Sequence, residues 1–206
     1  MNVDFWNKVA ESYDKDTEET YSSANQMTID TSIKFCHKDM SILDIGCGTG
    51  SFTLPMAKHV KYVKAIDYSP KMLHIAKSKC KCENISNIDW CCEDLTHANS
   101  GKTYDMITAF NVLTYLPNLE DCFKKVYEHL DDSGYFLSVT DCLGEKNIFS
   151  KIASKLLGKL GIVPKTCTLK INNLKALMQD AGFEIVLGDN LHEDPSNYFI
   201  AARKKL

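Results

Sequence analysis

The chain has 206 residues, of which 44% are hydrophobic and 25% are charged, and its formal net charge is −3 at pH 7. This composition is typical of a folded globular domain and excludes disorder as the main state. The balanced charge and the single arginine, Arg203, argue against a nucleic-acid-binding surface. No apolar run is long enough to span a membrane, and the first residues lack the pattern of a secretory signal. We therefore expect a cytoplasmic protein.

The chain contains 9 cysteines, an odd number without a secretory signal, so we expect reduced thiols. A zinc site built from Cys80, Cys82, Cys91 and Cys92 is the alternative. Structural zinc pairs usually leave two to four residues between their ligands, and these pairs do not. The sequence therefore predicts no metal.

Residues 1–40 have a helical pattern, in which Phe5, Trp6, Val9 and Tyr13 lie on one approximate stripe. The stripe is explained by a helix packed on the body of the protein, and equally by a cap over a site. Both interpretations can hold together, and we expect an N-terminal helical cap.

From residue 41 onward, short apolar runs alternate with helical patterns. The predicted strands are Ser41–Ile45, Tyr62–Asp67, Ile85–Cys91, Tyr104–Phe110, Gly134–Thr140, Phe183–Gly188 and Tyr198–Ala202. Helices are predicted near 51–59, 70–80, 118–130 and 172–181. Strands rich in Ile, Val and Leu favour a parallel sheet that is covered on both faces. The predicted fold is an α/β three-layer sandwich with a seven-stranded, mostly parallel sheet.

The last two predicted strands are joined by residues 189–197, a connection too short for a crossover helix. They should therefore pair antiparallel, which makes the last strand the reversed one. No internal repeat or linker divides the chain, so we expect a single domain over residues 1–206.

The most informative motif is a glycine loop, Gly46-Cys47-Gly48-Thr49-Gly50, which follows the first predicted strand. Glycines at these positions permit a tight turn and a close approach of the main chain to a ligand. A dinucleotide site would have Gly or Ala at position 51, where this chain has Ser51. Asp44 before the loop would repel phosphates and attract a cation. The implied ligand is nucleoside-like, lacks phosphates and carries positive charge.

Polar residues also follow the next three strands. Asp67 ends the second strand, about where a nucleotide fold places its ribose-binding acid. Asp94 follows the third strand, beside Glu93, and Asn111 follows the fourth. The carboxyl ends of parallel strands meet at one edge of a sheet, where open α/β folds bind ligands.

With these motifs in place, the chain resembles the class I S-adenosylmethionine-dependent methyltransferases, especially those that act on small molecules. The resemblance covers residues 4–204 and includes the run from Phe5 to Asp14. It implies S-adenosylmethionine as the cofactor and S-adenosylhomocysteine as the product. The cofactor-binding residues that it implies are Tyr13, Asp44, Gly46, Cys47, Gly48, Gly50, Asp67, Tyr68, Met72, Asp94, Leu95, Phe110 and Asn111.

Candidate acceptor contacts come from the same edge of the sheet. They are Tyr21, Tyr115 and Asp141, with His192 in the last connection as a candidate catalytic base. An exposed loop histidine is the simpler interpretation of His192. Methyl transfer needs a base only when the attacking group carries a proton that it does not lose freely.

Residues 142–170 form an insertion with an amphipathic pattern, in which an apolar stripe begins at Ile148 and a lysine stripe at Lys151. A lid over the acceptor or a helix packed on the body explains the pattern better than peripheral membrane contact by 146–160.

Three functions are weighed. A small-molecule methyltransferase is favoured over a silent cofactor-binding module that acts through a partner. A protein or nucleic-acid methyltransferase is disfavoured, because the run after Asn111 lacks the Pro-Pro-aromatic pattern of base-modifying relatives and the chain is acidic. The identity of the acceptor and the oligomeric state stay open.

Overall fold

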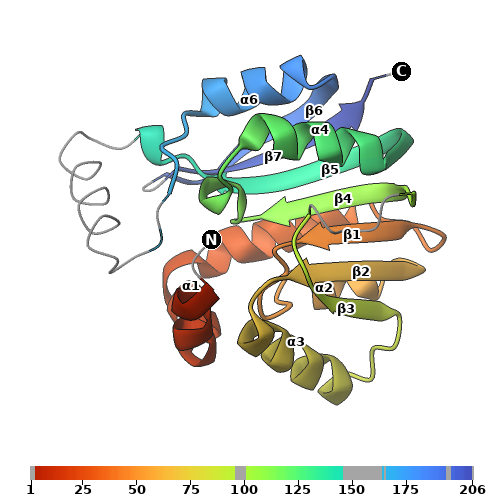
Figure 1. The fold of residues 1–206 in the computed structure, drawn as a ribbon, viewed down its shortest axis with the longest axis vertical. Coiled ribbons are helices and arrows are strands. Elements are labelled where there is room, and N and C mark those ends of the chain that lie inside the picture. Colours follow the sequence, from red (N-terminus) through yellow and green to blue (C-terminus); the bar gives the residue numbers. More distant parts are fainter. Residues whose placement is uncertain (1–2, 96–100, 146–163, 165, 194–195, 206) are drawn as a thin grey trace.

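A seven-stranded sheet forms the centre of the molecule (Figure 1). The computed structural model describes residues 3–95, 101–145, 164, 166–193 and 196–205. The strands are β1 (Ser41–Ile45), β2 (Tyr62–Asp67), β3 (Ile88–Cys92), β4 (Tyr104–Phe110), β5 (Leu130–Asp141), β6 (Phe183–Glu193) and β7 (Ser196–Lys204). Their order is β3-β2-β1-β4-β5-β7-β6, with β1 to β5 paired in parallel and β7 antiparallel to β5 and β6. The predicted sheet with its reversed last strand is confirmed.

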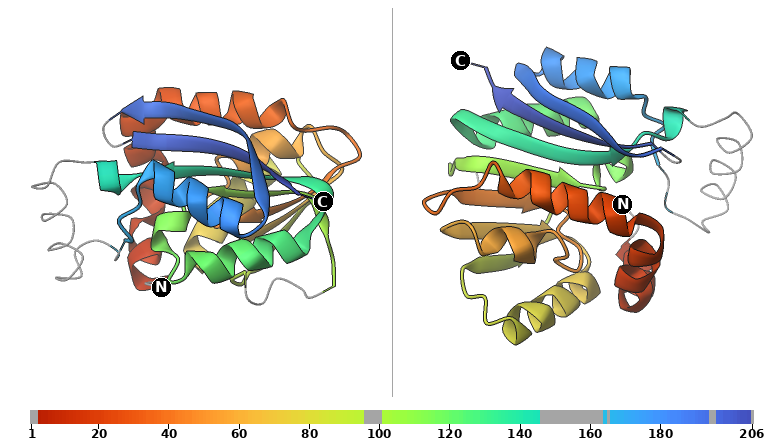
Figure 2. Two further views of the ribbon diagram at one scale, coloured as in Figure 1. Left: turned by 90° about the horizontal axis from the view of Figure 1, so that it is seen from above. Right: turned by 180° about the vertical axis from the view of Figure 1, so that it is seen from behind.

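Helices cover both faces of the sheet. They are α1 (Val3–Ile33), α2 (Thr53–Ala57), α3 (Pro70–Cys82), α4 (Leu119–His129) and α6 (Ile171–Asp180), with short 3-10 helices η1 (Leu113–Tyr115) and η2 (Leu143–Glu145). Figure 2 shows α4 and α6 on one face and α1 with α2 on the other. Phe123 and Met178 belong to the core under α4 and α6, whereas Met56 and Leu73 belong to the opposite core. The three-layer arrangement is therefore confirmed.

The start of α3 is fixed by a local signal. Ser69 is the N-cap, and its Oγ accepts the Met72 N–H at 3.2 Å. Pro70 follows at the first helical position, where its missing N–H costs no hydrogen bond. This cap sets α3 directly behind the end of β2 and holds Met72 next to Asp67.

Helix α1 has two parts. At Tyr21 the backbone leaves the helical region, with φ −126° and ψ 17°. Beyond this kink, Ala24, Thr28 and Ser32 are buried against the body of the protein. The part before the kink lies across the end of the sheet where the first strands finish (Figures 1 and 2). The predicted N-terminal helix is thus present, and its first part reaches the ligand-binding edge.

The last two strands are longer than predicted. β6 continues beyond Gly188 to Glu193 and β7 begins at Ser196, so most of the predicted connection 189–197 is strand. His192 therefore lies in β6 opposite Asn197, and its predicted position in a loop is wrong. The extension is a two-stranded ribbon with a register shift between Asn190 and His192. Asp189, Asn190 and Glu193 are exposed, whereas Ser196 and Asn197 are buried, and these polar residues gave no apolar pattern from which pairing could be predicted.

Most of the predicted insertion 142–170, including its apolar and lysine stripes, lies outside the described residues. At its described ends, the Gly144 N–H donates to the Leu169 carbonyl at 2.6 Å and the Cys167 N–H donates to the Thr114 carbonyl at 2.8 Å. Among the described residues, no helix combines the length and the hydropathy needed to cross a membrane.

Candidate functional site

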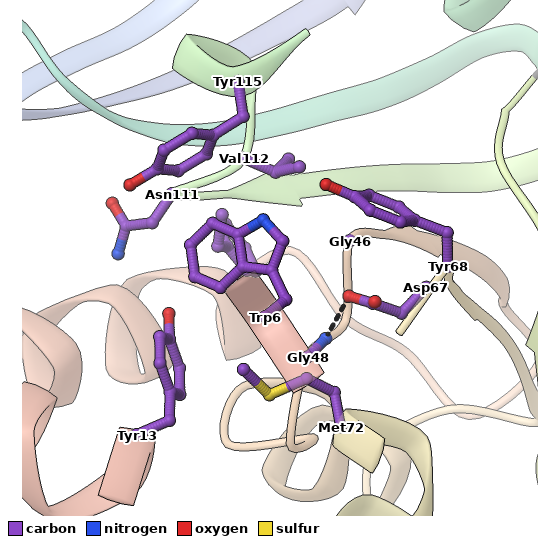
Figure 3. Close-up of a pocket in the computed structure, with 11 residues that line it drawn as sticks. Trp6, Tyr13, Gly46, Gly48, Asp67, Tyr68, Met72, Asn111, Val112 and Tyr115 are labelled. Carbon is purple, nitrogen blue, oxygen red and sulfur yellow. Dashed lines mark hydrogen bonds between the residues drawn. The ribbon is translucent and has the colours of Figure 1, made fainter. Parts of the chain in front are cut away.

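A pocket opens where β1, β2 and β4 end (Figure 3). Its volume is about 430 Å³, including space that is open to solvent. The lining residues are Trp6, Tyr13, Gly46, Gly48, Asp67, Tyr68, Met72, Phe110, Asn111, Val112 and Tyr115. The pocket lies at the edge where open α/β sheets bind ligands.

The glycine loop brings main chain to the pocket. Gly46 has φ +69° and Gly48 has φ +55°, both in the left-handed region that favours glycine. The Gly46 N–H donates to the Ile66 carbonyl at 2.8 Å, which ties the loop to β2. A Cβ on Gly46 would lie 2.5 Å from Val112 Cγ2, whereas a Cβ on Gly48 would have no neighbour within 4 Å. Gly46 therefore permits close packing, and Gly48 keeps the loop open toward the pocket.

Two other loop residues lie outside the lining. Cys47 is buried in the core, and its N–H donates to the Ile66 carbonyl at 3.1 Å. A Cβ on Gly50 would lie 3.0 Å from the Trp90 ring. Both residues pack on the side of the loop away from the pocket. We therefore expect them to affect a ligand only by changing the conformation of the loop's main chain.

Asp67, at the end of β2, belongs to the pocket wall. Its Oδ2 accepts the Gly48 N–H at 3.0 Å and its Oδ1 accepts the Ser69 N–H at 2.7 Å. Burial raises the pKa of Asp67 above its ordinary value of 3.8. An ionised carboxylate has about four acceptor positions, so each oxygen keeps capacity after its amide bond. Asp67 can thus accept hydroxyl donors, which is the role predicted for it toward a ribose.

Asp44 lies beneath the pocket and not in its wall. Only 2% of the residue is exposed. Its Oδ2 accepts the Thr53 hydroxyl at 2.5 Å and its Oδ1 accepts the Thr108 hydroxyl at 2.7 Å. Burial raises the pKa of Asp44 above its ordinary value. The direct ligand contact predicted from the sequence does not match this position, because both oxygens bind hydroxyls that join β1 to α2 and β4.

A smaller hollow of about 300 Å³ adjoins the pocket. The two share Gly46, Asp67, Tyr68 and Val112 in their linings. Asp94 and Leu95, which follow β3, line only the smaller hollow of the two. Glu93 beside them pairs with Lys64, whose Nζ lies 2.6 Å from Glu93 Oε1. Glu93 lines the smaller hollow as well.

Aromatic side chains face one another across the pocket. Trp6 and Tyr13 come from α1, and Tyr115 comes from η1 (Figure 3). The Trp6 ring centroid lies 5.0 Å from that of Tyr115 and 6.1 Å from that of Tyr13. Burial raises the pKa of Tyr115 to about 12 and raises that of Tyr13 above its ordinary 10.0. Both hydroxyls are therefore protonated at neutral pH.

Asn111 is held in an unusual backbone conformation, with φ +54°. Its Oδ1 accepts a hydrogen bond from Asn197 Nδ2 at 2.9 Å, and the same nitrogen donates to Asp141 Oδ1 at 2.8 Å. Asn197 is only 2% exposed, so this bridge is shielded from water. It joins the ends of β4, β5 and β7 behind the pocket wall.

The four candidate acceptor and catalytic residues separate into two groups. Tyr115 lines the pocket, and Asp141 lies behind Asn111 through the Asn197 bridge. Tyr21 and His192 lie outside the lining and pack on each other, with ring centroids 5.3 Å apart. The structure therefore does not place His192 against the pocket.

Sequence reasoning missed three residues of the site. Trp6 was placed on the same stripe as Tyr13, so its spacing was the available signal. Val112 packs against Gly46 and follows the predicted Asn111. Asn197 gave no local signal, because its partner Asn111 is 86 positions away.

The site is built to bind and orient. Among the described lining residues, the ionisable side chains are Asp67, Tyr13, Tyr68 and Tyr115. None of these is a cation or a thiol nucleophile. The arrangement suits a ligand that brings its own reactive group.

Known proteins share the sequence pattern. Residues 42–134 match the family described as "Methyltransferase domain". A malonyl-[acyl-carrier protein] O-methyltransferase of Priestia megaterium is 29% identical over 159 residues, which cover 76% of this chain and 57% of the relative. The chain thus spans little more than half the length of that relative.

Solved structures share the fold. The magnesium protoporphyrin IX methyltransferase of Synechocystis, solved with bound S-adenosylhomocysteine, superposes with a TM-score of 0.72 at 19% identity over 91% of this chain and 86% of the other. The DhpI complex with S-adenosylhomocysteine has a TM-score of 0.78 at 15% identity over 98% and 95%. Together with the glycine loop and the acid at the end of β2, these matches confirm the predicted resemblance to the class I S-adenosylmethionine-dependent methyltransferases.

Proposed function

We propose that this chain binds S-adenosylmethionine in the described pocket and transfers its methyl group to a small-molecule acceptor. The observation that carries the proposal is the pairing of Asp67 with Gly48. It sets a carboxylate with spare acceptor capacity beside an open stretch of main chain. The matches to methyltransferases support the same reaction.

Each part of S-adenosylmethionine, the methyl donor, can be assigned to residues that suit its chemistry. Asp67 would accept the ribose hydroxyls, and the smaller hollow between Tyr68 and Leu95 would take the adenine, with Asp94 near its amino group. The cationic methionine end would lie toward Tyr13 and Asn111, because aromatic faces and amide oxygens stabilise positive charge.

S-adenosylmethionine supplies a methyl group that is already activated by positively charged sulfur. The protein must therefore orient an acceptor toward that methyl group and exclude water. Trp6 and Tyr13 cover the pocket from α1 and fit the second task. Because their pKa values are raised, the Tyr13 and Tyr115 hydroxyls stay protonated at neutral pH, so they can donate hydrogen bonds and cannot act as bases there. Orientation, rather than base catalysis, is the contribution that we assign to the described lining.

The charge of the walls favours one class of acceptor. The described lining carries the Asp67 carboxylate and no Lys, Arg or His. An anionic acceptor would find no cationic side chain in the described lining to bind its charge, and only the sulfonium of the cofactor would offset the Asp67 carboxylate. We therefore propose an acceptor without net negative charge, such as an amine or an uncharged hydroxyl compound.

The test combines calorimetry with transfer of a labelled methyl group. Binding of S-adenosylhomocysteine and faster transfer to amines and neutral phenols than to matched carboxylic acids would support the proposal. Binding of S-adenosylhomocysteine without methyl transfer to any acceptor tested would favour the silent cofactor-binding module. Methyl transfer to protein or nucleic acid would favour a protein or nucleic-acid methyltransferase. Absence of binding would overturn the assignment of the pocket.

Asp44→Asn tests the support beneath the glycine loop. We expect the free energy of unfolding to fall by about 1–3 kcal/mol, because Thr53 or Thr108 loses a charged acceptor. Affinity for S-adenosylhomocysteine should fall as well, since the loop begins two residues later. Urea unfolding and calorimetry measure the two effects.

The matched control is Asp105→Asn. Asp105 accepts two hydrogen bonds from Ser41 at the opposite end of β1, at 2.7 and 2.9 Å. The Asp105→Asn substitution should lower the stability of the protein and leave its affinity for S-adenosylhomocysteine unchanged. Equal affinity in both variants would show that Asp44 does not act on the loop.

Tyr115→Phe and His192→Ala separate donor from acceptor effects. Tyr115→Phe keeps the ring against Trp6, so affinity for S-adenosylhomocysteine should change by less than about threefold while kcat or acceptor KM changes. His192→Ala should leave the affinity for S-adenosylhomocysteine and the turnover near their wild-type values, because His192 packs on Tyr21 outside the lining. A loss of on the order of 10²-fold in kcat for His192→Ala, with an altered pH profile, would instead support a catalytic base. Steady-state kinetics over pH 6–9 decides between them.

A further inference from the structure

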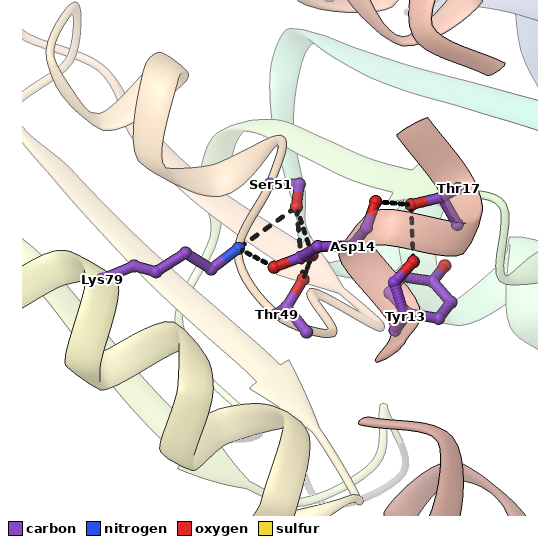
Figure 4. A network of polar contacts seen from close by, with 6 residues as sticks. All are labelled: Tyr13, Asp14, Thr17, Thr49, Ser51 and Lys79. Carbon is purple, nitrogen blue, oxygen red and sulfur yellow. Dashed lines mark hydrogen bonds and ion pairs between the residues drawn. The ribbon is translucent and has the colours of Figure 1, made fainter. Parts of the chain in front are cut away.

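One carboxylate outside the pocket joins three separate segments of the chain. Asp14, on the first part of α1, accepts the Thr49 hydroxyl at 2.5 Å and the Ser51 hydroxyl at 3.1 Å through Oδ1 (Figure 4). Its Oδ2 lies 2.8 Å from Lys79 Nζ on α3. The glycine loop, α3 and α1 therefore meet at a single side chain.

A second attachment lies two turns earlier on the same helix. Asn7 Oδ1 accepts the Ser69 hydroxyl at 2.8 Å and the Lys71 N–H at 3.3 Å, both at the start of α3. Trp6 and Tyr13, which cover the pocket, each directly precede one of these two attached residues. The contacts of Asn7 and Asp14 thus fix the two aromatic side chains over the ligand space.

The first part of α1 has a defined end at which it can turn. The helix is broken at Tyr21, and the buried residues after the break begin at Ala24. Before the break, the residues near Asp14 are largely exposed, apart from those facing the pocket. Buried Ala10 and the ring contact of Trp6 with Tyr115 attach this part to the body of the protein, and the polar contacts of Asp14 and Asn7 add to them.

We propose that Asp14 is a positioning residue that latches the first part of α1 across the cofactor pocket, and that this latch opens when the cofactor enters and when its product leaves. The inference rests on the proposed function of the pocket. Trp6 and Tyr13 line the pocket from α1, so a movement of this part of α1 would widen the way in for a ligand. Asp14 itself is not among the residues that line the pocket, so it would act through its neighbour Tyr13.

The charge state of Asp14 supports the latch. Partial burial alone would raise its pKa, but the hydrogen bonds from Lys79 and Thr49 and the charge of Lys79 outweigh burial and hold the pKa below 3.8. The carboxylate is therefore ionised near neutral pH, where it binds lysine and hydroxyl donors most strongly.

A gate makes a kinetic prediction that a purely structural role does not. Because the latch is closed in the unliganded protein, its loss should speed both entry and release of S-adenosylhomocysteine. For Asp14→Ala and Lys79→Met we expect the release rate to rise about 5- to 30-fold, because each substitution removes one or two charge-assisted hydrogen bonds that hold α1 closed. The Kd should change by a smaller factor, since the association rate rises too. Stopped-flow fluorescence measures both rates.

The matched control is Glu18→Gln, one turn further along α1. Glu18 accepts the Ser22 hydroxyl of its own helix at 2.6 Å, a contact that stays within α1, so both rates should stay at the wild-type values. In the double variant Asp14→Ala/Lys79→Met, the release rate should match that of Asp14→Ala alone, because both changes open the same contact. Additive effects would contradict a shared latch.

The outcomes separate the latch from the function on which it rests. If the wild type does not bind S-adenosylhomocysteine, the proposed function fails. If it binds and Asp14→Ala leaves the release rate unchanged, the latch alone is wrong. A rise in Kd equal to the rise in release rate, with an unchanged association rate, would also overturn the gate and leave only a structural role. Thermal unfolding of each variant checks that the fold is retained.

Discussion

Asp67→Ala is expected to weaken binding of S-adenosylhomocysteine by about 10- to 150-fold. The carboxylate is charged and can accept two hydroxyls beyond its bonds to Gly48 and Ser69, and hydrogen bonds to a charged group contribute about 1.5–3 kcal/mol. Asp67→Asn should fall between the wild type and alanine, because an amide keeps one acceptor oxygen. Isothermal calorimetry gives the affinities directly.

The control for Asp67 is Asp89→Ala, an exposed acid on the neighbouring β3. The affinity of Asp89→Ala for S-adenosylhomocysteine should equal that of the wild type. Unchanged affinity in Asp67→Ala, in a variant with normal thermal unfolding, would remove Asp67 from the donor site.

The pH dependence of binding follows from the same side chain. Burial raises the pKa of Asp67, and the ionised form is the one that accepts hydroxyls. Affinity should therefore be constant near neutral pH and fall as the pH decreases through the raised pKa. The fall should be absent in Asp67→Asn, which has no proton to gain.

Gly46→Ala is expected to destabilise the protein by about 2–5 kcal/mol. The left-handed backbone at φ +69° costs a residue with a Cβ about 1–2 kcal/mol, and the crowding against Val112 adds about 1–3 kcal/mol. Chemical denaturation measures the total. Cofactor affinity should fall too, because the loop must move away from Val112.

Gly48→Ala is the control that separates strain from crowding. Its φ of +55° carries a similar backbone cost, but nothing lies within 4 Å of the added Cβ. Its stability loss should be limited to about 1–2 kcal/mol. Combining Gly46→Ala with Val112→Ala should recover part of the loss. Equal destabilisation by the two single substitutions would show that contact with Val112 is unimportant.

The sequence predicted the parts of the fold whose signals are local. The apolar runs of β1, β2 and β4 are bounded by glycines and polar residues, and their predicted limits match the structure. The beginning of β3 was predicted three residues too early, at Ile85 and not Ile88, because an apolar residue in the preceding turn extends the apolar pattern. The end of β6 and the start of β7 were missed because main-chain pairing continues through polar residues that give no apolar pattern.

Part of the site was predictable from residue types at strand ends, and the family resemblance added Tyr68, Met72 and Phe110, which also line the pocket. Asp67 and Gly48 follow from their positions at strand ends, and they lie in the pocket. Asp44 looked equivalent to Asp67 in sequence, but the hydroxyls of Thr53 and Thr108 that occupy it come from other elements. The attachment of α1 through Asp14 has the same origin, because the loop and α3 meet it only in three dimensions.

The Asn197 bridge has a consequence for the order in which the site is assembled. Asn197 belongs to β7, which inserts between β5 and β6, and its partners Asn111 and Asp141 lie 86 and 56 positions earlier. While the chain is being synthesised, the glycine loop, Asp67 and Asn111 leave the ribosome well before β7 does. Until β7 pairs, the edge of β5 stays open to association with other chains, and Asn111 lacks the partner that holds its side chain. Maturation of the pocket therefore depends on the slow, long-range closure of the sheet at the opposite end of the sequence.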